Sequence, residues 1–247
     1  MLFKHLNINI FYEKYGNKKN TILILPGWGN TRPTFNYIID NIKDFFTIYI
    51  IDYPSFGNSP TPTKSLTIYD YAEVIKEFIK AKNIEPIIIA HSFGGRIVSI
   101  LEGKYNVKVK KNILIDVAGI KRKSLKLRLK TIIYKILMKI SSKKQKEIIR
   151  NKFSSNDYKE LNPVMKQTFK NIISEDLTKY YKNINIDTLI LWGEKDSDTP
   201  LKDAKKLNKI IKNSGLVIFK DTKHFSYLEK SLETLLIIKE FIKKDMD

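Results

Sequence analysis

The stretch that decides the fold is Ile87-Ile88-Ile89-Ala90-His91-Ser92-Phe93-Gly94-Gly95-Arg96-Ile97-Val98. Its apolar, β-branched beginning predicts a strand buried on both faces, and the residues after Ser92 predict a helix. Small residues at Ala90 and Gly94 permit the sharp, strained turn that presents a serine hydroxyl at the end of a strand. The first N–H groups of the helix point to the same place. The pattern therefore predicts that Ser92 is a nucleophile; the alternative is an ordinary strand–turn–helix junction with a capping serine.

Similar apolar runs recur along the chain and alternate with amphipathic stretches. We expect strands at 6–12, 21–25, 46–51, 86–90, 112–115, 188–192 and 216–219, and helices at 33–43, 67–82, 94–105, 200–212 and 228–243. Continuous apolar strands separated by helices indicate a parallel sheet covered on both faces, with the first strand antiparallel. The alternation stops between about 120 and 185, where the sequence predicts several helices. We therefore divide the chain into a core of residues 1–119 and 186–247 and a helical lid of residues 120–185.

The composition limits the chemistry that the chain can perform. Its 247 residues include no cysteine and three histidines, and 43% are hydrophobic, as in a folded globular domain. The absence of cysteine excludes a disulfide framework, a cysteine nucleophile and thiolate metal sites. No uninterrupted apolar run approaches the roughly 20 residues of a membrane span, and the first residues lack a signal-peptide pattern. We expect a cytoplasmic protein that requires no metal or organic cofactor.

A serine nucleophile needs a base that takes its proton. Of the three histidines, His224 lies just after the last expected strand, where a loop can reach the carboxyl ends of the other strands. His5 lies in the first strand, far along the chain from the turn. His91 is the neighbour of Ser92, so its side chain should point away from the serine and pack beside the turn. Elimination therefore favours His224 as the base.

The base in turn needs a carboxylate that orients it, and the reaction needs donors for an oxyanion. The acid should follow the strand before the last, where Glu194, Asp196 and Asp198 are candidates. One oxyanion donor is the backbone N–H after the nucleophile, that of Phe93. The other is expected in the glycine-containing loop at 26–30, where the N–H of Trp28 is the candidate. The order serine, acid, histidine differs from that of the other two well-known serine triads.

These motifs, in this order, resemble those of the α/β-hydrolase superfamily over essentially the whole chain. The matching segments are 26–29, 52–59, 90–95, 192–200 and 224–229. Pro26 and Ser55 depart from the family pattern, since they replace a histidine and a glycine. The resemblance implies the α/β-hydrolase fold: a mostly parallel central sheet, helices on both faces and a small helical lid inserted after the sixth strand. It also selects Asp196 as the acid.

The resemblance further implies an activity. Relatives with serine at this turn include bacterial carboxylesterases, among them those acting on pimeloyl-acyl carrier protein methyl ester, whose oxyanion loop and small lid look similar. The implied mechanism is carboxylic ester hydrolysis through an acyl-enzyme, with Ser92, His224 and Asp196 as the triad and the N–H groups of Trp28 and Phe93 as the oxyanion hole. A thioesterase, a carbon–carbon bond hydrolase and a non-catalytic ligand-binding protein that retains the triad are the alternatives.

The charge of the chain is concentrated in the expected lid. The formal net charge is +19, and residues 121–152 alone hold 13 basic residues against one acid. Apolar residues at helical spacing in the same segment predict a basic amphipathic helix. Beside a small-molecule or carrier-bound acyl ester, this lid fits an acidic carrier, an anionic membrane surface or an anionic small substrate. Nucleic acid fits less well, because a lid over a pocket is a poor place to read a duplex. The competing interpretation is a lysine-rich solvated face that reflects AT-rich coding DNA.

Overall fold

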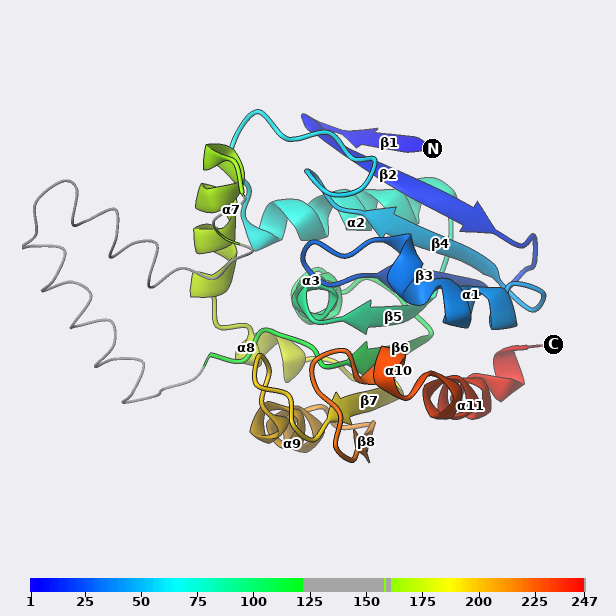
Figure 1. Ribbon diagram of the computed structural model, residues 1–247. Helices are drawn as coiled ribbons and strands as arrows, with labels where there is room; N and C mark the ends of the chain where they lie inside the picture. Colours follow the sequence, from blue (N-terminus) through cyan, green and yellow to red (C-terminus); the bar gives the residue numbers. More distant parts are fainter. Residues whose placement is uncertain (122–157, 159–160, 247) are drawn as a thin grey trace, which may run out of the picture.

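The computed structural model describes residues 1–121, 158 and 161–246. Within them, one sheet has the strand order β1-β2-β4-β3-β5-β6-β7-β8 (Figure 1). The strands are β1 (Leu2–His5), β2 (Ile8–Tyr15), β3 (Thr21–Leu25), β4 (Thr47–Asp52), β5 (Ile87–His91), β6 (Lys111–Ile115), β7 (Thr188–Gly193) and β8 (Ser214–Phe219). β2 is antiparallel to β1 and β4, and all pairs from β4 to β8 are parallel. The prediction of a mostly parallel sheet is confirmed.

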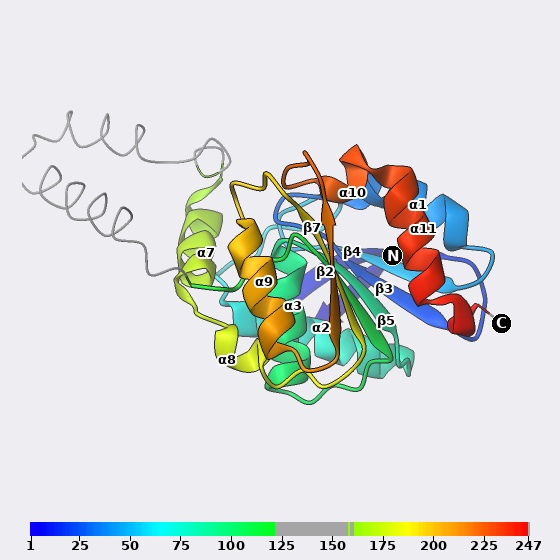
Figure 2. The ribbon, with the colours of Figure 1, turned by 90° about the horizontal axis from the view of Figure 1, so that it is seen from below.

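Helices cover both faces of the sheet, as Figure 2 shows. The helices are α1 (Asn36–Ile42), α2 (Ile68–Lys82), α3 (Phe93–Gly103), α7 (Pro163–Ser174), α8 (Thr178–Tyr181), α9 (Leu201–Ile210), α10 (Ser226–Glu229) and α11 (Ser231–Phe241), with short 3₁₀ turns η1 (Arg32–Phe35) and η2 (Lys243–Asp245). α1, α10 and α11 lie on one face, and α2, α3, α8 and α9 lie on the other. No helix in the described ranges is both long enough and apolar enough to cross a membrane.

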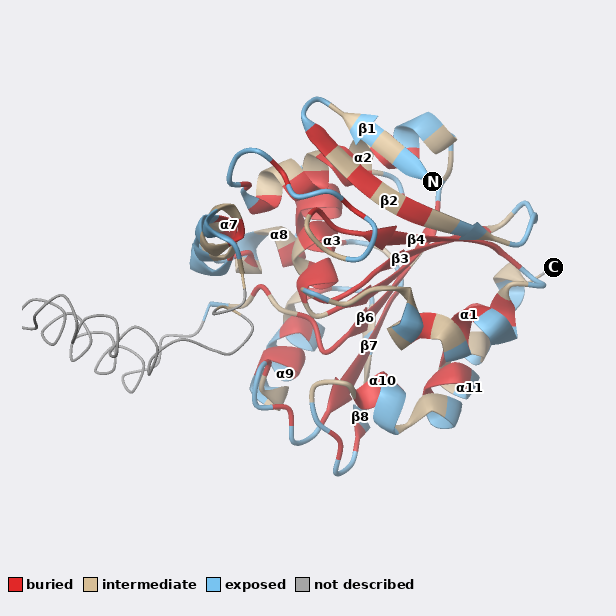
Figure 3. Cartoon of the chain, turned by 45° about the horizontal axis from the view of Figure 1, so that its top comes forward, coloured by how far each residue is buried: buried red, intermediate tan, exposed pale blue. Residues whose placement is uncertain are grey.

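The central strands supply side chains to two separate cores, because successive residues of a strand point to opposite faces. In β3, Leu23 and Leu25 pack in the core beneath α2 and α3, whereas Ile22 and Ile24 pack in the core beneath α1 and α11. Every residue of β3, β4, β5 and β7 is buried (Figure 3). This double burial explains why these strands appear in the sequence as continuous apolar runs.

The N-terminal region differs from the single strand predicted at 6–12. A tight turn at Leu6, where φ is 51°, divides it into the hairpin β1–β2. β1 is an edge strand with no buried residue, and Leu2 is 54% exposed. An edge strand that buries so little leaves no apolar run in the sequence, which is why the pattern predicts only the second strand.

The stretch between β6 and β7 contains α7 and α8 among its described residues. α7 is bound to the sheet domain at its middle and at its C-terminal end. Arg96 of α3 donates two hydrogen bonds from Nη1, to the carbonyl oxygens of Ile172 (3.1 Å) and Glu175 (3.3 Å) at the end of α7. The Leu66 N–H donates to Thr168 Oγ1 near the middle of α7 (2.9 Å). The basic helix expected over 121–152 lies outside the described residues except for residue 121, and the division into core and lid stays a prediction.

The two ends of this stretch lie next to each other. The N–H of Lys121 donates to Asp176 Oδ1 (3.4 Å), and its ammonium donates to the carbonyl oxygen of Ser174 (3.1 Å). The N–H of Leu177 donates to the carbonyl oxygen of Gly119 (2.9 Å). The chain therefore leaves the sheet domain and returns to it at one place.

Candidate active site

Ser92 occupies the strained turn that the sequence predicts between β5 and α3. Its φ of 45° and ψ of −106° lie in a region that non-glycine residues rarely adopt. The turn is held by a hydrogen bond from the Ser92 N–H to Ile115 (3.1 Å) and one from the Ala118 N–H to the Ser92 carbonyl (2.9 Å). Gly94 permits the close crossing of β3, because a Cβ there would stand 2.1 Å from the carbonyl oxygen of Leu25.

The structure brings the predicted base and acid to this serine. His224 follows β8, and its Nε2 lies 2.9 Å from Ser92 Oγ. Its other ring nitrogen, Nδ1, lies 2.8 Å from Oδ2 of Asp196, which follows β7. The side chain of Asp196 is 0% exposed and that of His224 is 14% exposed. Because Asp196 is an acceptor, the Nδ1 proton belongs on the histidine, and Nε2 is free to accept from the serine hydroxyl.

Asp196 is saturated with hydrogen-bond donors. Its Oδ1 accepts from the N–H groups of Asp198 (2.8 Å) and Thr199 (2.9 Å), and its Oδ2 accepts from Thr199 Oγ1 (2.6 Å) as well as from the histidine. Burial raises the pKa of Asp196, but the bonds from His224 and Thr199 outweigh it and hold the pKa below its usual value. Burial lowers the pKa of His224, but the bond to Asp196 and the charges of Asp196, Asp116 and Asp198 outweigh it, so this pKa is raised.

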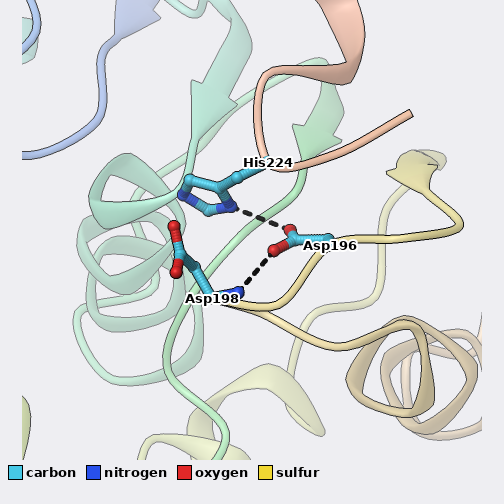
Figure 4. A group of neighbouring side chains, drawn as sticks. All are labelled: Asp196, Asp198 and His224. Atoms are coloured by element: carbon cyan, nitrogen blue, oxygen red, sulfur yellow. Dashed lines mark hydrogen bonds and ion pairs between the residues drawn. The ribbon is translucent and has the colours of Figure 1, made fainter.

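The other two candidate acids do not make this bond. Asp198 lies beside the pair (Figure 4), where Asp196, Asp198 and His224 offer ligand atoms within 4.8 Å of one another, a spacing that could hold a metal ion. A cation there would have to displace existing bonds, since both Asp196 oxygens accept hydrogen bonds and His224 Nδ1 donates one of them. Glu194 binds the loop after β8 instead, since its Oε2 accepts a hydrogen bond from the N–H of Asp221 (3.1 Å).

The remaining histidines are not positioned as bases. His91 is completely buried beside the turn, where its ring packs against Phe225 and Tyr227. Its Nε2 lies 2.9 Å from the backbone carbonyl oxygen of His224, so it holds the loop that carries the base. Burial lowers the pKa of His91 to about 3, which keeps its ring neutral. His5 ends β1 at the far edge of the sheet.

The two expected oxyanion donors come from residues that touch each other. Phe93 is the first residue of α3, so its N–H has no carbonyl one turn earlier with which to bond. The indole of Trp28 meets the ring of Phe93 edge to face, with centroids 5.3 Å apart. Gly27 keeps this loop close to β5, because a Cβ there would stand 2.7 Å from His91 Nδ1. The assignment of these two N–H groups to an oxyanion hole stays a prediction.

A pocket of about 580 Å³ opens beside these groups. Its lining residues are Trp28, Gly29, Asn30, Ser55, Phe56, Leu161, Asn162, Met165 and Phe225. The walls thus come from the loop after β3, the segment after β4, the beginning of α7 and the residue after His224. Trp28 extends the aromatic wall through edge contacts with Phe56 (5.0 Å between centroids) and Phe169 (5.5 Å). The pocket can receive a moderately sized group, and its lining is mixed, with Asn30, Ser55 and Asn162 beside the apolar side chains.

Two residues at this site are missing from the sequence predictions. Thr199 binds Asp196 through both its N–H and its hydroxyl. Asp116 is a buried carboxyl group directly after β6. The signal for Asp116 is present in the sequence, since a carboxylate that ends a buried parallel strand lies at the same sheet edge as the residues that follow the other strands. Because a triad requires only one acid, the motifs do not predict a role for Asp116.

Comparisons with known proteins agree with this architecture. A family model described as alpha/beta hydrolase fold matches residues 20–126. The pimeloyl-[acyl-carrier protein] methyl ester esterase of Wigglesworthia glossinidia brevipalpis is 28% identical over 264 residues, covering 95% of this chain and 98% of that one. The AB hydrolase superfamily protein YisY of Bacillus subtilis is 25% identical over 260 residues, covering 95% and 96%.

Solved structures show the same fold. MGS-M2, an alpha/beta hydrolase enzyme from a Medee basin deep-sea metagenome library, superposes with a TM-score of 0.77 at 22% identity, covering 98% of this chain and 97% of its own. The chain therefore has the α/β-hydrolase fold. Its relatives in the α/β-hydrolase superfamily include an esterase that spans nearly its whole length.

Proposed function

We propose that the protein is a serine carboxylesterase that works through an acyl-enzyme. The observation that carries the proposal is the continuous chain from Ser92 Oγ to His224 Nε2 (2.9 Å) and from His224 Nδ1 to Asp196 Oδ2 (2.8 Å). In the first step His224 takes the hydroxyl proton while Ser92 Oγ attacks the ester carbonyl carbon. The N–H groups of Phe93 and Trp28 hold the oxyanion, and Asp196 stabilises the imidazolium.

The second half of the reaction reverses these roles. His224 gives its proton to the departing alcohol, which leaves Ser92 acylated. Water then enters, His224 takes one of its protons, and the hydroxide attacks the acyl carbon. The tetrahedral intermediate collapses, the acid leaves, and Ser92 regains its proton from His224. The strained backbone at Ser92 keeps the hydroxyl presented to the base throughout.

The substrate that we propose is a small or carrier-bound acyl ester. The 580 Å³ pocket suits an acyl chain, and a relative of nearly equal length acts on an ester carried by acyl carrier protein. The 13 basic residues of 121–152, opposed by one acid, would attract an acidic carrier to this part of the chain. The small ester and the carrier-bound ester would react at the same site, and rates measured with one substrate of each kind distinguish them.

Labelling with a fluorophosphonate and hydrolysis of aryl esters test the proposed nucleophile. Ser92→Ala should abolish both while the protein remains folded. Ser99→Ala is the matched control, because Ser99 is a buried serine of the same helix whose hydroxyl donates to the carbonyl oxygen of Arg96 (2.8 Å). Labelling or substantial turnover that survives Ser92→Ala would overturn the assignment. A series of acyl chain lengths then defines the pocket.

A further inference from the structure

Asp116 is a buried carboxyl group that the mechanism above does not use. It follows β6, its residue exposure is 0%, and its backbone has a φ of 46°, in the left-handed region. Burying a carboxyl group costs free energy unless hydrogen bonds compensate, and a left-handed aspartate adds strain. Because an aspartate here is unfavourable for both reasons, its contacts should explain why it occupies this position.

The contacts of Asp116 join the two loops that carry the proposed acid and base. Its Oδ1 accepts from the N–H of Gly193 (2.7 Å), the last residue of β7, immediately before the loop of Asp196. Its Oδ2 accepts from the N–H (3.2 Å) and hydroxyl (2.6 Å) of Ser226, two residues after His224. One carboxyl group thus holds both loops against the end of β6.

A further contact passes through Thr199. The Thr199 hydroxyl lies 3.0 Å from the carbonyl oxygen of Asp116 and 2.6 Å from Asp196 Oδ2. It is also 3.3 Å from His224 Nδ1. The Asp116 residue therefore reaches the hydrogen bond between Asp196 and His224 from its backbone as well as from its side chain.

We infer that Asp116 is a positioning residue of this hydrolase, which fixes the separation of the Asp196 and His224 loops and whose negative charge stabilises the protonated form of His224. This inference rests on the proposed triad. It assigns Asp116 no contact with substrate; its effect passes through the two residues whose loops it joins.

The electrostatic part of the inference depends on the groups around His224. Among the described residues, Asp196 and Asp198 face it from the loop after β7, and His91 faces it from β5 but is neutral. Burial raises the pKa of Asp116 to about 7 against the lowering effect of its hydrogen-bond donors. The charge of His224 is among the influences that lower the pKa of Asp116, and the charge of Asp116 raises the pKa of His224, so the two groups favour each other's charged forms.

The test measures the pKa of His224 by NMR, which needs no turnover, together with the pH profile of ester hydrolysis. With three histidines in the chain, and His91 neutral, the signals are simple to assign. Asp116→Asn removes the charge, and Ser226→Ala removes only the 2.6 Å hydroxyl bond in case the first variant does not fold. Glu102→Gln is the matched control, since it makes the same carboxyl-to-amide exchange at a buried position nine residues along α3, about 14 Å from the turn.

We expect Asp116→Asn to lower the His224 pKa by roughly 0.5 to 1 and the acidic limb of the kcat profile to move with it. The same variant should lower kcat by roughly 10- to 100-fold with KM little changed, the scale of a small misplacement of reacting groups. Ser226→Ala should move both quantities in the same direction by less, and Glu102→Gln should move neither.

A His224 pKa that is unchanged in Asp116→Asn, or in Ser226→Ala where the first variant is unfolded, overturns the inference and leaves a structural role alone. So does an equal change in Glu102→Gln. Failure of the proposed function has a different signature, namely a parent protein without Ser92-dependent labelling or turnover, whatever the His224 titration shows.

Discussion

Replacing Asp196 with asparagine should cost this enzyme most of its activity while sparing its fold. The backbone N–H groups of Asp198 and Thr199 already bind Oδ1, so the amide oxygen of asparagine would remain with them and its NH₂ group would face His224. His224 Nδ1 must then accept a hydrogen bond, which places the ring proton on Nε2, where Ser92 needs an acceptor. In the best-studied serine triad the same exchange lowers kcat on the order of 10⁴-fold, or about 5.5 kcal/mol of activation free energy.

The assay is steady-state hydrolysis of an aryl ester by the parent protein, Asp196→Asn and Asp198→Asn, with thermal unfolding as the check on folding. Asp198→Asn is the matched comparison, because Asp198 lies in the same loop and its charge raises the pKa of His224. We expect it to lower the His224 pKa slightly and to leave kcat near that of the parent. If Asp198→Asn is the damaging change, or Asp196→Asn keeps a tenth of the parent rate, the reasoning from this geometry is wrong.

Three further outcomes follow from other parts of the structure. Gly94→Ala should lower the midpoint of urea unfolding and remove activity, because its Cβ would stand 2.1 Å from a backbone oxygen, whereas Gly215→Ala, whose Cβ meets nothing within 4 Å, should do neither. Burial raises the pKa of Glu102 from 4.5 to about 8, so its neutral form stabilises the fold below pH 4.5 and this stability is lost as pH rises to 8. The free energy of unfolding of Glu102→Gln, measured in urea, should therefore rise relative to that of the parent between pH 5 and 9, by up to about 5 kcal/mol. A difference in free energy of unfolding that does not change with pH would contradict this. Replacing the four basic residues of 121–126 with glutamine should abolish the salt dependence of kcat/KM for a carrier-bound ester and leave that for a neutral short ester unchanged; equal salt profiles for both substrates in the parent would favour the solvated-face interpretation.

The parts of the fold that were predictable are those where burial leaves a pattern in the sequence. The strands predicted at 21–25, 86–90 and 188–192 match β3, β5 and β7, which are buried on both faces and therefore almost entirely apolar in sequence. The edge strand β1 buries no residue, and nothing in its sequence distinguishes it from a loop. The position where Ser55 replaces the family glycine has a φ of 73°, which explains why glycine is usual there.

In the candidate site, the residues whose types are required by the chemistry were predictable. The contacts that depend on the folded arrangement were not. Ser92, Asp196 and His224 were predictable because each chemical role admits few residue types and each follows a strand. The contact between His91 Nε2 and the backbone carbonyl oxygen of His224 was not predictable, since every residue has a backbone carbonyl and the sequence does not show which one is bound. The role of Asp116 is not predictable from the triad, because a triad requires only one acid.

The joined ends of the stretch between β6 and β7 have a consequence for how such an enzyme can change. Lys121 is bound to Ser174 and Asp176, and Gly119 to Leu177, so the two ends of this stretch are held together beside the sheet. Lengthening or shortening a loop whose ends are already held together costs little, about 0.6 kcal/mol for each doubling of its length. This stretch can therefore be exchanged as a cassette: a designer could graft another insertion between residues 121 and 161 and select for new substrates, leaving Ser92 and its partners as they are.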